Sequence, residues 1–541
     1  MNIASRRIYH WLAALVSGTL LVLSFPKFEF SFLAWIALVP LLFVLTQTEP
    51  TLRRAFGLGW VTGFVFFFFS CNWITHSMIR YGGMNLVLAY AVAALFSAII
   101  GLFPALFALA TVRLQQVFGL WALGLAPLLW VATEWLRAII TGVTWNALGV
   151  SQVGQVAVAH FAQIGGAALI SSSIVATSAA LILLLNIQTQ TAKRILALFL
   201  FVALAFVLAE LRNASAPGIT LKPTPITVAG IQPNLPVDIL THPDEFTQRN
   251  ISGMETNLKL TRDAINETPN KKADLIVWAE SPLVLNYEQD ETARNKLNAL
   301  AKEYNAHLLF SALGRNGEQV YNSVQTITPN DKALKRYDKM RLVPFGEYVP
   351  LRAVLGWFVP AMIGDFTPGN TATVNSLKLA TEVSVVQNEE TNGEVALERT
   401  TNFVKVGTFI CYEAAYPNLV RQFVTNGATL LINVSDDAWF GNSAGAVQHL
   451  NHARMRAIEN NRDIVRVTNS GVSALITATG EVVAPLPMFA AASKVWSAEE
   501  HKGLTFYAQY GDWFAILSVV LSGATIVFSF VKKPLSIRAN S

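Results

Sequence analysis

The sequence predicts a multi-pass α-helical membrane bundle joined to an extramembrane α/β domain, and three observations lead to this fold class. Of the 541 residues, 53% are hydrophobic and only 14% are charged, which is too apolar for an ordinary soluble protein. Before about residue 212 the apolar residues form blocks near the length of a bilayer span, and one such block returns near the C-terminus. The segment between them has a globular composition in which strand-like and helical patterns alternate.

The apolar blocks predict about eight membrane-spanning helices, at residues 8–25, 31–46, 56–72, 84–112, 118–138, 164–187, 194–211 and 512–531. Arg6 and Arg7 precede the first block as they would in a signal peptide, but Phe25-Pro26-Lys27 follows it in place of a small-residue cleavage site. We therefore expect this block to remain as a helix. Residues 1–212 then form a transmembrane bundle of about seven helices, and residues 512–541 form a closing helix with a tail.

The positions of Lys and Arg predict the orientation, because short basic loops stay on the cytoplasmic side of a membrane. Basic residues mark alternate crossings at Arg6, Arg7, Arg53, Arg54, Arg113, Lys193, Arg194, Lys532, Lys533 and Arg538. Both termini are therefore expected in the cytoplasm, with residues 213–511 on the far side. The net charge of +5 fits this topology, and no long basic run interleaved with aromatic residues suggests a nucleic-acid partner.

The extramembrane segment alternates short apolar strands with amphipathic helices, which is typical of an α/β sandwich whose sheets are covered by helices. Helices are expected at residues 255–265, 293–304 and 448–462. Strands are expected at residues 226–232, 274–279, 307–312, 320–327, 404–410, 429–434, 464–468 and 474–477.

Two cysteines occur, Cys71 in an apolar helix and Cys411 in the extramembrane domain, so no disulfide framework is available. Cys411 stands where the apolar run 403–410 meets the polar turn that begins Tyr412-Glu413. A lone cysteine is usually a small buried hydrophobe. An unpaired thiol on the secreted side, at the end of a strand, is also a candidate nucleophile.

Glu280 and Lys339 complete a set of residues that suits covalent acyl chemistry. Glu280 follows the strand-like run 275–279, and Lys339 precedes the turn-rich segment 341–347. A thiol with an ordinary pKa of about 8.5 needs a base near neutral pH, and the tetrahedral oxyanion formed by its attack needs a positive charge or N–H donors. Glu280 suits the role of base. Lys339, with the backbone N–H of Tyr412, suits the stabilisation of the oxyanion.

The contexts of these three residues resemble the Glu-Lys-Cys triad of the nitrilase superfamily. The matching segments are Trp278-Ala279-Glu280-Ser281-Pro282, the run 337–347 around Lys339, and Ile410-Cys411-Tyr412-Glu413. The runs 433–441, 452–459 and 468–473 narrow the resemblance to the apolipoprotein N-acyltransferase family. It covers essentially the whole chain and implies a nitrilase-like αββα sandwich on the periplasmic side of the inner membrane. Two departures, Ser435-Asp436-Asp437 and an apparent insertion at residues 380–400, leave the triad intact.

The resemblance implies an acyltransferase of lipoprotein maturation. Its donor is a glycerophospholipid, its intermediate a thioester on the cysteine, and its acceptor the α-amino group of the diacylglyceryl cysteine that begins an apolipoprotein. Glu280, Lys339 and Cys411 are the catalytic residues that it implies, with Glu347, Tyr412 and Glu413 in support. No cofactor is expected.

The apolar segment 351–363 is too short to span a bilayer and too apolar for a solvated loop. We expect either that it packs in the domain core or that Trp357 and Phe358 touch lipid, as a lid beside the active site. The sequence leaves two roles for Asn322. An Asn at the edge of a strand either orients a catalytic carboxylate or has a structural role.

Four other polar residues have a structural explanation as well as a functional one. Glu134 and Arg137 stand at i and i+3 inside a predicted span, either as a functional pair or as an ion pair near the interface. His449 and His452 share i, i+3 spacing, but no third ligand and no HExxH motif accompany them. No metal site is therefore expected.

Two other functions remain compatible with these residues. A membrane-tethered amidase would use the same triad with water as acceptor, although a single helix would suffice as its anchor. A transporter or receptor with an inert nitrilase-like domain would not need the intact triad. The acyltransferase accounts for both the triad and the bundle.

Overall fold

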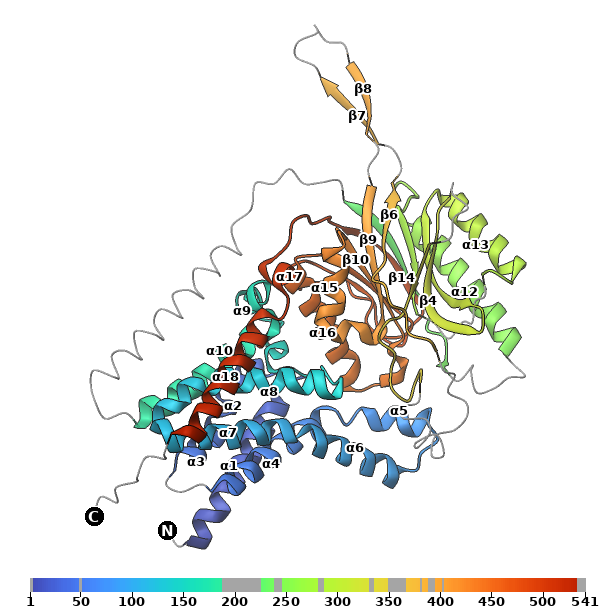
Figure 1. Ribbon diagram of the computed structural model, residues 1–541. Helices are drawn as coiled ribbons and strands as arrows, with labels where there is room; N and C mark the ends of the chain where they lie inside the picture. Colours follow the sequence, from blue (N-terminus) through green and yellow to red (C-terminus); the bar gives the residue numbers. More distant parts are fainter. Residues whose placement is uncertain are drawn as a thin grey trace. The chain divides into compact units, whose positions relative to one another are not determined.

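The computed structural model describes residues 3–47, 51–186, 225–237, 246–280, 287–329, 335–348, 366–379, 382–387, 395–400 and 403–532 (Figure 1). The chain divides into two compact units. The first comprises the described residues of Met1–Ile219, Phe440–Glu459 and Thr505–Ser541, and the second those of Thr220–Trp439 and Asn460–Leu504.

The first unit is helical. Its α-helices are α1 (Ile3–Leu23), α2 (Ala34–Ala37), α3 (Val39–Thr46), α4 (Leu52–Ser70), α5 (Ile74–Arg80), α6 (Leu86–Ile100), α7 (Leu102–Phe118), α8 (Ala126–Thr141), α9 (Val156–Ala159), α10 (Ala162–Asn186), α16 (Ala444–Asn460), α17 (Phe506–Tyr510) and α18 (Trp513–Val531).

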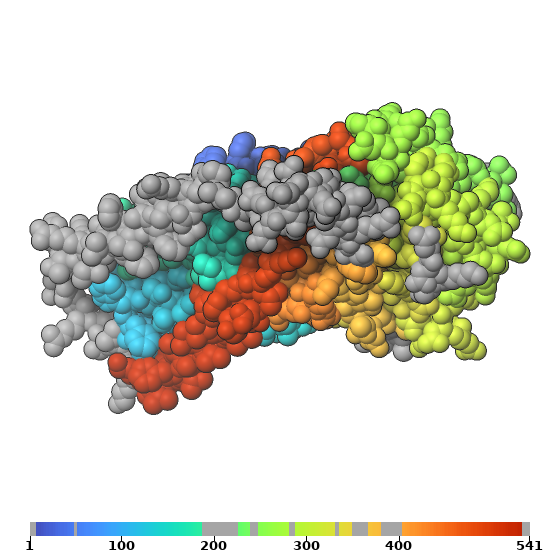
Figure 2. All heavy atoms as spheres, turned by 90° about the horizontal axis from the view of Figure 1, so that it is seen from above, coloured from blue at the N-terminus to red at the C-terminus, as the bar shows by residue number. Residues whose placement is uncertain are grey.

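Among the described residues, four helical segments are long and apolar enough to cross a membrane, and they establish this chain as a membrane protein. They are Leu52–Ser70, Leu86–Thr141, Ala162–Asn186 and Trp513–Val531, and the shorter apolar helices are Arg7–Leu23 and Ser31–Thr46. The predicted spans 84–112 and 118–138 both fall in Leu86–Thr141, where α6 and α7 are separated at Gly101. The predicted span 194–211 lies outside the described residues. Exposed apolar side chains along α18, red in Figure 2, include Val520, Val527 and Phe530.

Small residues let the helices of this unit approach closely, as is common in membrane bundles. A Cβ on Gly59 of α4 would lie 2.4 Å from the carbonyl oxygen of Pro104 in α7. Helix α10 is kinked where Gly166 adopts φ +66°, and a Cβ there would lie 2.8 Å from the ring of Tyr507. Glycine is therefore required at both contacts.

Helix α16 comes from the sequence predicted to form the extramembrane domain, yet it packs within the first unit. Gln448 holds it there. Its Oε1 accepts hydrogen bonds from the indole N–H groups of Trp73 (3.0 Å) and Trp145 (2.7 Å). Its Nε2 donates to the carbonyls of Pro26 and Ser70, each at 2.9 Å. All four hydrogen-bonding positions of this buried amide are thus used.

The second unit is an α/β sandwich. In the described residues its first six-stranded sheet has the order β14-β1-β2-β3-β4-β5, and its second the order β13-β12-β11-β10-β9-β6. The strands are β1 (Ile226–Gln232), β2 (Leu275–Trp278), β3 (His307–Asn316), β4 (Gln319–Ile327), β5 (Lys335–Asp338), β6 (Val374–Lys378), β9 (Phe403–Ile410), β10 (Leu430–Ser435), β11 (Ile464–Thr468), β12 (Ala474–Ile476), β13 (Val482–Val483) and β14 (Ala492–Ala498).

Strands β7 (Glu382–Gln387) and β8 (Val395–Thr400) form a separate antiparallel pair within the segment expected to be an insertion. Elsewhere both sheets are mixed. β1, β2 and β3 run parallel, as do β9, β10 and β11, while the strands at the sheet edges run antiparallel to their neighbours.

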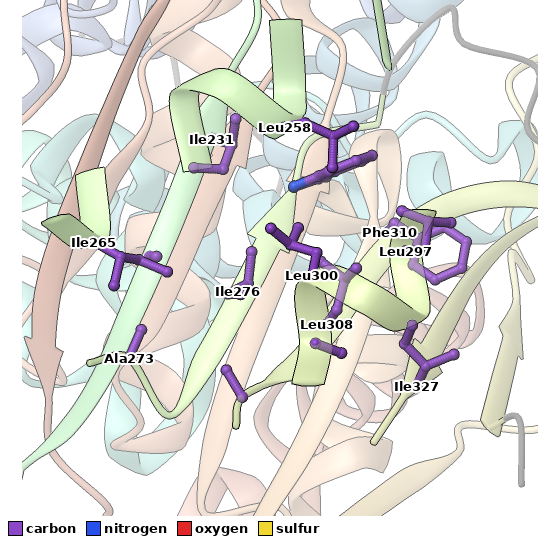
Figure 3. Close-up of a cluster of buried hydrophobic side chains, with 14 of the residues drawn as sticks. Ile231, Leu258, Ile265, Ala273, Ile276, Leu297, Leu300, Leu308, Phe310 and Ile327 are labelled. Carbon is purple, nitrogen blue, oxygen red and sulfur yellow. The ribbon is translucent and has the colours of Figure 1, made fainter. Parts of the chain in front are cut away.

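Helices α12 (Phe246–Asn266) and α13 (Glu291–Tyr304) cover the outer face of the first sheet. Figure 3 shows Leu258 and Leu297 from these helices beside Ile276 and Leu308 from the sheet. On the second sheet, a Cβ on Gly407 would lie 2.7 Å from the Cβ of Phe423 in α15 (Pro417–Thr425), so this helix packs directly on β9.

The two sheets pack face to face, since a Cβ on Gly230 of β1 would lie 3.0 Å from Val467 of β11. The predicted αββα arrangement is confirmed. Every residue of β10 and β11 is buried. This is typical of central parallel strands that are covered on both faces.

Candidate active site

Cys411 lies at the point where β9 ends and the short 3-10 helix Cys411–Ala415 begins. Its backbone has φ +50°, in the left-handed region that residues other than glycine rarely adopt. Such a conformation costs about 1–2 kcal/mol, and it recurs at sites where a side chain must be held in a particular direction. The residue is 7% exposed. The sharp turn thus holds the thiol in a buried position beyond the sheet.

Glu280 and Lys339 lie beyond the ends of β2 and β5 and are joined to each other. Lys339 Nζ donates to Glu280 Oε1 at 3.3 Å, and the lysine side chain is only 1% exposed. Glu280 Oε2 accepts the backbone N–H of Asp436 at 3.1 Å. Because Asp436 follows β10 of the second sheet, this bond links the two sheets across the site.

Glu347 is a second anion on Lys339. Lys339 Nζ donates to Glu347 Oε1 at 2.8 Å, and the backbone N–H of Val343 donates to Oε2 at 2.8 Å. Asn322 Nδ2 donates to Glu280 Oε1 (2.8 Å) and to Glu347 Oε1 (2.7 Å). One cation and one amide therefore hold both carboxylates in place. Of the two roles considered for Asn322, the structure shows the contact that orients a carboxylate.

The electrostatics favour a charged lysine and a protonated resting thiol. Burial by itself lowers the pKa of Lys339, whereas the negative charges of Glu280 and Glu347 raise it. The charges outweigh the burial, so the pKa of Lys339 lies well above its ordinary value. Burial, followed by the charge of Glu280, raises the pKa of the Cys411 thiol, although Lys339 acts in the opposite direction. The thiol can therefore react as a thiolate only when a base takes its proton.

Glu413 connects the cysteine turn with the lysine loop. Its Oε1 accepts backbone N–H groups from Met340 (2.6 Å) and Arg341 (3.1 Å), and its Oε2 accepts that of Ile410 (2.7 Å). The hydroxyl of Tyr337 donates to both oxygens. Burial raises the pKa of this carboxyl to about 7. Glu413 thus sets the spacing between the loop after Lys339 and the turn at Cys411.

The ring of Tyr412 packs edge-on against Tyr416, with the ring centroids 5.3 Å apart. Trp357 and Phe358 lie outside the described residues. Of the residues predicted from the sequence, the structure joins Glu280, Lys339 and Glu347 by hydrogen bonds, and Glu413 lies beside them on the backbone of the lysine loop. The charges of Glu280, Lys339 and Asp437 act on the Cys411 thiol.

Sequence reasoning missed a buried group beside the thiol. Arg466 Nη2 pairs with Asp437 Oδ2 at 2.6 Å, Arg466 Nη1 also donates to Asn433, and Ser435 Oγ donates to Asp437 Oδ1 at 2.8 Å. Arg466 is fully buried. A charge in the middle of the apolar run Ile464–Thr468 was the available signal, because such a charge needs a buried partner.

The other candidates lie elsewhere, in the first unit. Glu134 accepts hydrogen bonds from Leu148 N (2.7 Å) and Ser171 Oγ (2.8 Å), while the Arg137 guanidinium lies 4.8 Å from the ring centroid of Phe67. Among the described residues, no cluster of three His, Cys, Asp or Glu is suited to a metal ion.

Comparison with known proteins agrees with the architecture. The family model described as the Apolipoprotein N-acyltransferase N-terminal domain matches residues 17–181, and that described as Carbon-nitrogen hydrolase matches residues 247–493. The chain is thus a membrane protein that carries a carbon-nitrogen hydrolase domain.

Relatives that match nearly the whole chain identify the family within this class. An apolipoprotein N-acyltransferase of Geobacter metallireducens is 30% identical over 97% of this chain and 96% of its own. The apolipoprotein N-acyltransferase of Pseudomonas syringae pv. tomato is 30% identical over 96% of this chain and 97% of its own. The crystal structure of Saccharomyces cerevisiae Nit3, a nitrilase-superfamily member, has 17% identity over 52% of this chain and 92% of its own, with a TM-score of 0.36. The chain belongs to the apolipoprotein N-acyltransferase family, as the motifs predicted, and is an enzyme.

Proposed function

We propose that this enzyme transfers an acyl chain from a glycerophospholipid, through a thioester on Cys411, to the α-amino group of the N-terminal diacylglyceryl cysteine of apolipoproteins. The observation that carries the proposal is the buried thiol held at a strained turn, under the charges of Glu280 and Lys339. The relatives' name supports the acceptor class.

In the first half-reaction, Glu280 takes the proton of the Cys411 thiol as sulfur attacks the ester carbonyl of the phospholipid. The carbonyl oxygen becomes an oxyanion, which Lys339 and the backbone N–H of Tyr412 stabilise. When the carbon–oxygen ester bond breaks, Glu280 returns its proton to the departing alkoxide. A lysophospholipid leaves, and the acyl chain remains on sulfur.

In the second half-reaction, the neutral α-amino group of the acceptor attacks the thioester carbonyl. Glu280 takes one amine proton and returns it to the cysteine sulfur when the carbon–sulfur bond breaks. The product is an amide, which is more stable than the thioester, so this half runs downhill. Water in place of the amine would give hydrolysis, as an amidase requires.

The surrounding contacts suit these roles. Glu347 and Asn322 hold Lys339 and Glu280 at fixed positions, so little reorganisation is needed as charge moves to the oxyanion. We assign Glu347 and Glu413 as positioning residues. Glu347 acts through the lysine and Glu413 through the loop and turn that it joins.

We also propose the topology that the basic residues predict. Residues 1–212 form a bundle of about seven transmembrane helices, residues 213–511 the periplasmic catalytic domain, and residues 512–541 a closing helix with a cytoplasmic tail. The four apolar segments found among the described residues support the membrane spans. The placement of both termini in the cytoplasm, and so of the catalytic domain on the far side of the inner membrane, rests on the basic residues that flank alternate spans.

The decisive experiment is the intact mass of the full chain in detergent, after incubation with phospholipid and no acceptor. We expect an added acyl mass that hydroxylamine removes, absent from Cys411→Ala and retained in Cys71→Ala, the matched variant of the other cysteine. An adduct from a small amide but none from phospholipid would instead support an amidase. No adduct from either would point to an inert domain.

A further inference from the structure

Ser435 occupies the position beside Cys411 on the neighbouring strand. β9 and β10 run parallel with Ile410 level with Val434, so Cys411 directly follows β9 at the level where Ser435 ends β10. Ser435 is fully buried, and its hydroxyl is hydrogen-bonded to the Cys411 side chain. It therefore touches the sulfur that the proposed function makes the nucleophile.

The hydroxyl also belongs to a charged chain of hydrogen bonds. Ser435 Oγ donates to Asp437 Oδ1 at 2.8 Å, and the other oxygen of Asp437 accepts from Arg466 at 2.6 Å. Gly471 closes this arrangement, since a Cβ there would lie 2.3 Å from Asp437 Oδ2. The carboxylate can shift little, and Arg466 keeps it neutralised whichever way the serine hydroxyl points.

We propose that Ser435 is a further catalytic residue, whose hydroxyl turns from Asp437 to donate a hydrogen bond to the Cys411 sulfur whenever that sulfur is a thiolate. This inference rests on the proposed role of Cys411 as nucleophile. A hydroxyl has one proton to donate and two lone pairs. In the resting state it accepts the thiol S–H and donates to Asp437, and after Glu280 takes the thiol proton it donates to sulfur instead.

The switch removes the bond from Ser435 to Asp437 Oδ1 but keeps the carboxylate paired with a cation. No proton leaves Ser435, because only the hydroxyl rotates, and Asp437 keeps its charge-assisted bond from Arg466. The thiolate forms twice in a cycle, on initial attack and again when the amine displaces sulfur. A donor available at both moments stabilises sulfur as nucleophile and as leaving group.

The pH dependence of Cys411 alkylation by iodoacetamide tests this role on the full chain, with the labelled peptide quantified by mass. The charged groups acting on the thiol are Glu280, Lys339 and Asp437. For Ser435→Ala we expect the alkylation midpoint to rise by about one pH unit, equivalent to about 1.4 kcal/mol. Acyl-enzyme formation should slow about tenfold.

Ser473→Ala is the matched control. Ser473 is a fully buried serine of the same unit whose hydroxyl bonds Gln232 and the backbone of Thr468. Its loss should lower stability to a similar extent but leave the alkylation midpoint unchanged. Equal midpoints for wild type and Ser435→Ala, or the same rise in Ser473→Ala, would overturn the proposal.

Asp437→Asn separates the hydroxyl's effect from general damage. The charge of Asp437 raises the pKa of Cys411, so its removal should lower the alkylation midpoint, opposite to Ser435→Ala. A rise in both variants would contradict the proposed switch. If Asp437→Asn fails to fold, Ser435→Ala alone decides. Failure of wild type to form an acyl adduct would refute the proposed function without affecting the alkylation result.

Discussion

Glu413→Gln tests how the lysine loop and the cysteine turn are held together. The carboxylate accepts backbone N–H groups from Met340 and Arg341 on one oxygen, and from Ile410 on the other. Glutamine has the same shape but replaces one acceptor by an NH₂ donor. The perturbation therefore changes hydrogen bonding with almost no change in volume.

The geometry sets the magnitude. If the amide oxygen keeps Met340 and Arg341, the NH₂ group faces the N–H of Ile410, and both donors lose their partner. Tyr337 can turn its hydroxyl to accept one amide hydrogen, since it lies within 2.8–2.9 Å of both oxygens. Buried unsatisfied donors cost about 1–3 kcal/mol each, so we expect a loss of about 2–4 kcal/mol.

Activity should fall further than stability suggests. A displacement of about 1 Å in a catalytic group can cost about 10²-fold in rate, and Glu413 spans the two segments that carry Lys339 and Cys411. We expect kcat/KM for acyl transfer to fall about 10²-fold.

Thermal unfolding and steady-state acyl transfer, both on the full chain in detergent, measure these effects. The melting temperature should fall by about 5–10 °C. Glu303→Gln is the control, because Glu303 is 40% exposed and its pair with Arg262 is worth under about 1 kcal/mol. If Glu413→Gln melts within 1–2 °C of wild type, as the control should, and keeps its activity, the hydrogen-bond reasoning is refuted.

Three further outcomes follow from buried contacts. Burial raises the pKa of Asp436 to about 8, so the protonated side chain stabilises the fold at low pH and this stabilisation is lost as the pH rises towards 8. Relative to Asp436→Asn, the free energy of unfolding of wild type should fall by about 1.4 kcal/mol per pH unit between about pH 4 and 8. Denaturant unfolding measures this difference. Gly471→Ala should cost about 3 kcal/mol or more in the same assay and lower activity, because its Cβ would displace Asp437 from Arg466; wild-type behaviour would mean that the loop moves freely. Gln448→Leu should cost about 2–4 kcal/mol by leaving two indole N–H groups unpaired, and an unchanged melting temperature would show that they find other partners.

The central strands could be predicted from the sequence and the edge strands could not. All eight predicted strands are present, from β1 to β12 of the two large sheets. The edge strands β5, β6, β13 and β14 were missed. A central strand such as Leu430–Ser435 is buried on both faces and is largely apolar, whereas an edge strand such as Lys335–Asp338 is partly exposed and mostly charged.

The position of helix α16 was likewise beyond sequence reasoning. Residues 448–462 carry a helical pattern, and the helix is present at Ala444–Asn460. Its partners Trp73 and Trp145 are about 300 or more positions away along the chain. Periodicity reports which residues form a helix, but only the tertiary structure decides which unit buries its polar face.

By itself, the sequence determined the class of protein and its family. Apolar blocks of bilayer length, a globular segment between them, and the ordered contexts of Glu280, Lys339 and Cys411 were enough, because these are local patterns. Only the tertiary structure decided what surrounds the thiol. Asn322, Ser435, Asp437 and Arg466 reach the site from separate segments of the chain, and the sequence alone does not show that these segments meet. Their roles come from burial and distance, which folding creates between residues that the chain keeps apart.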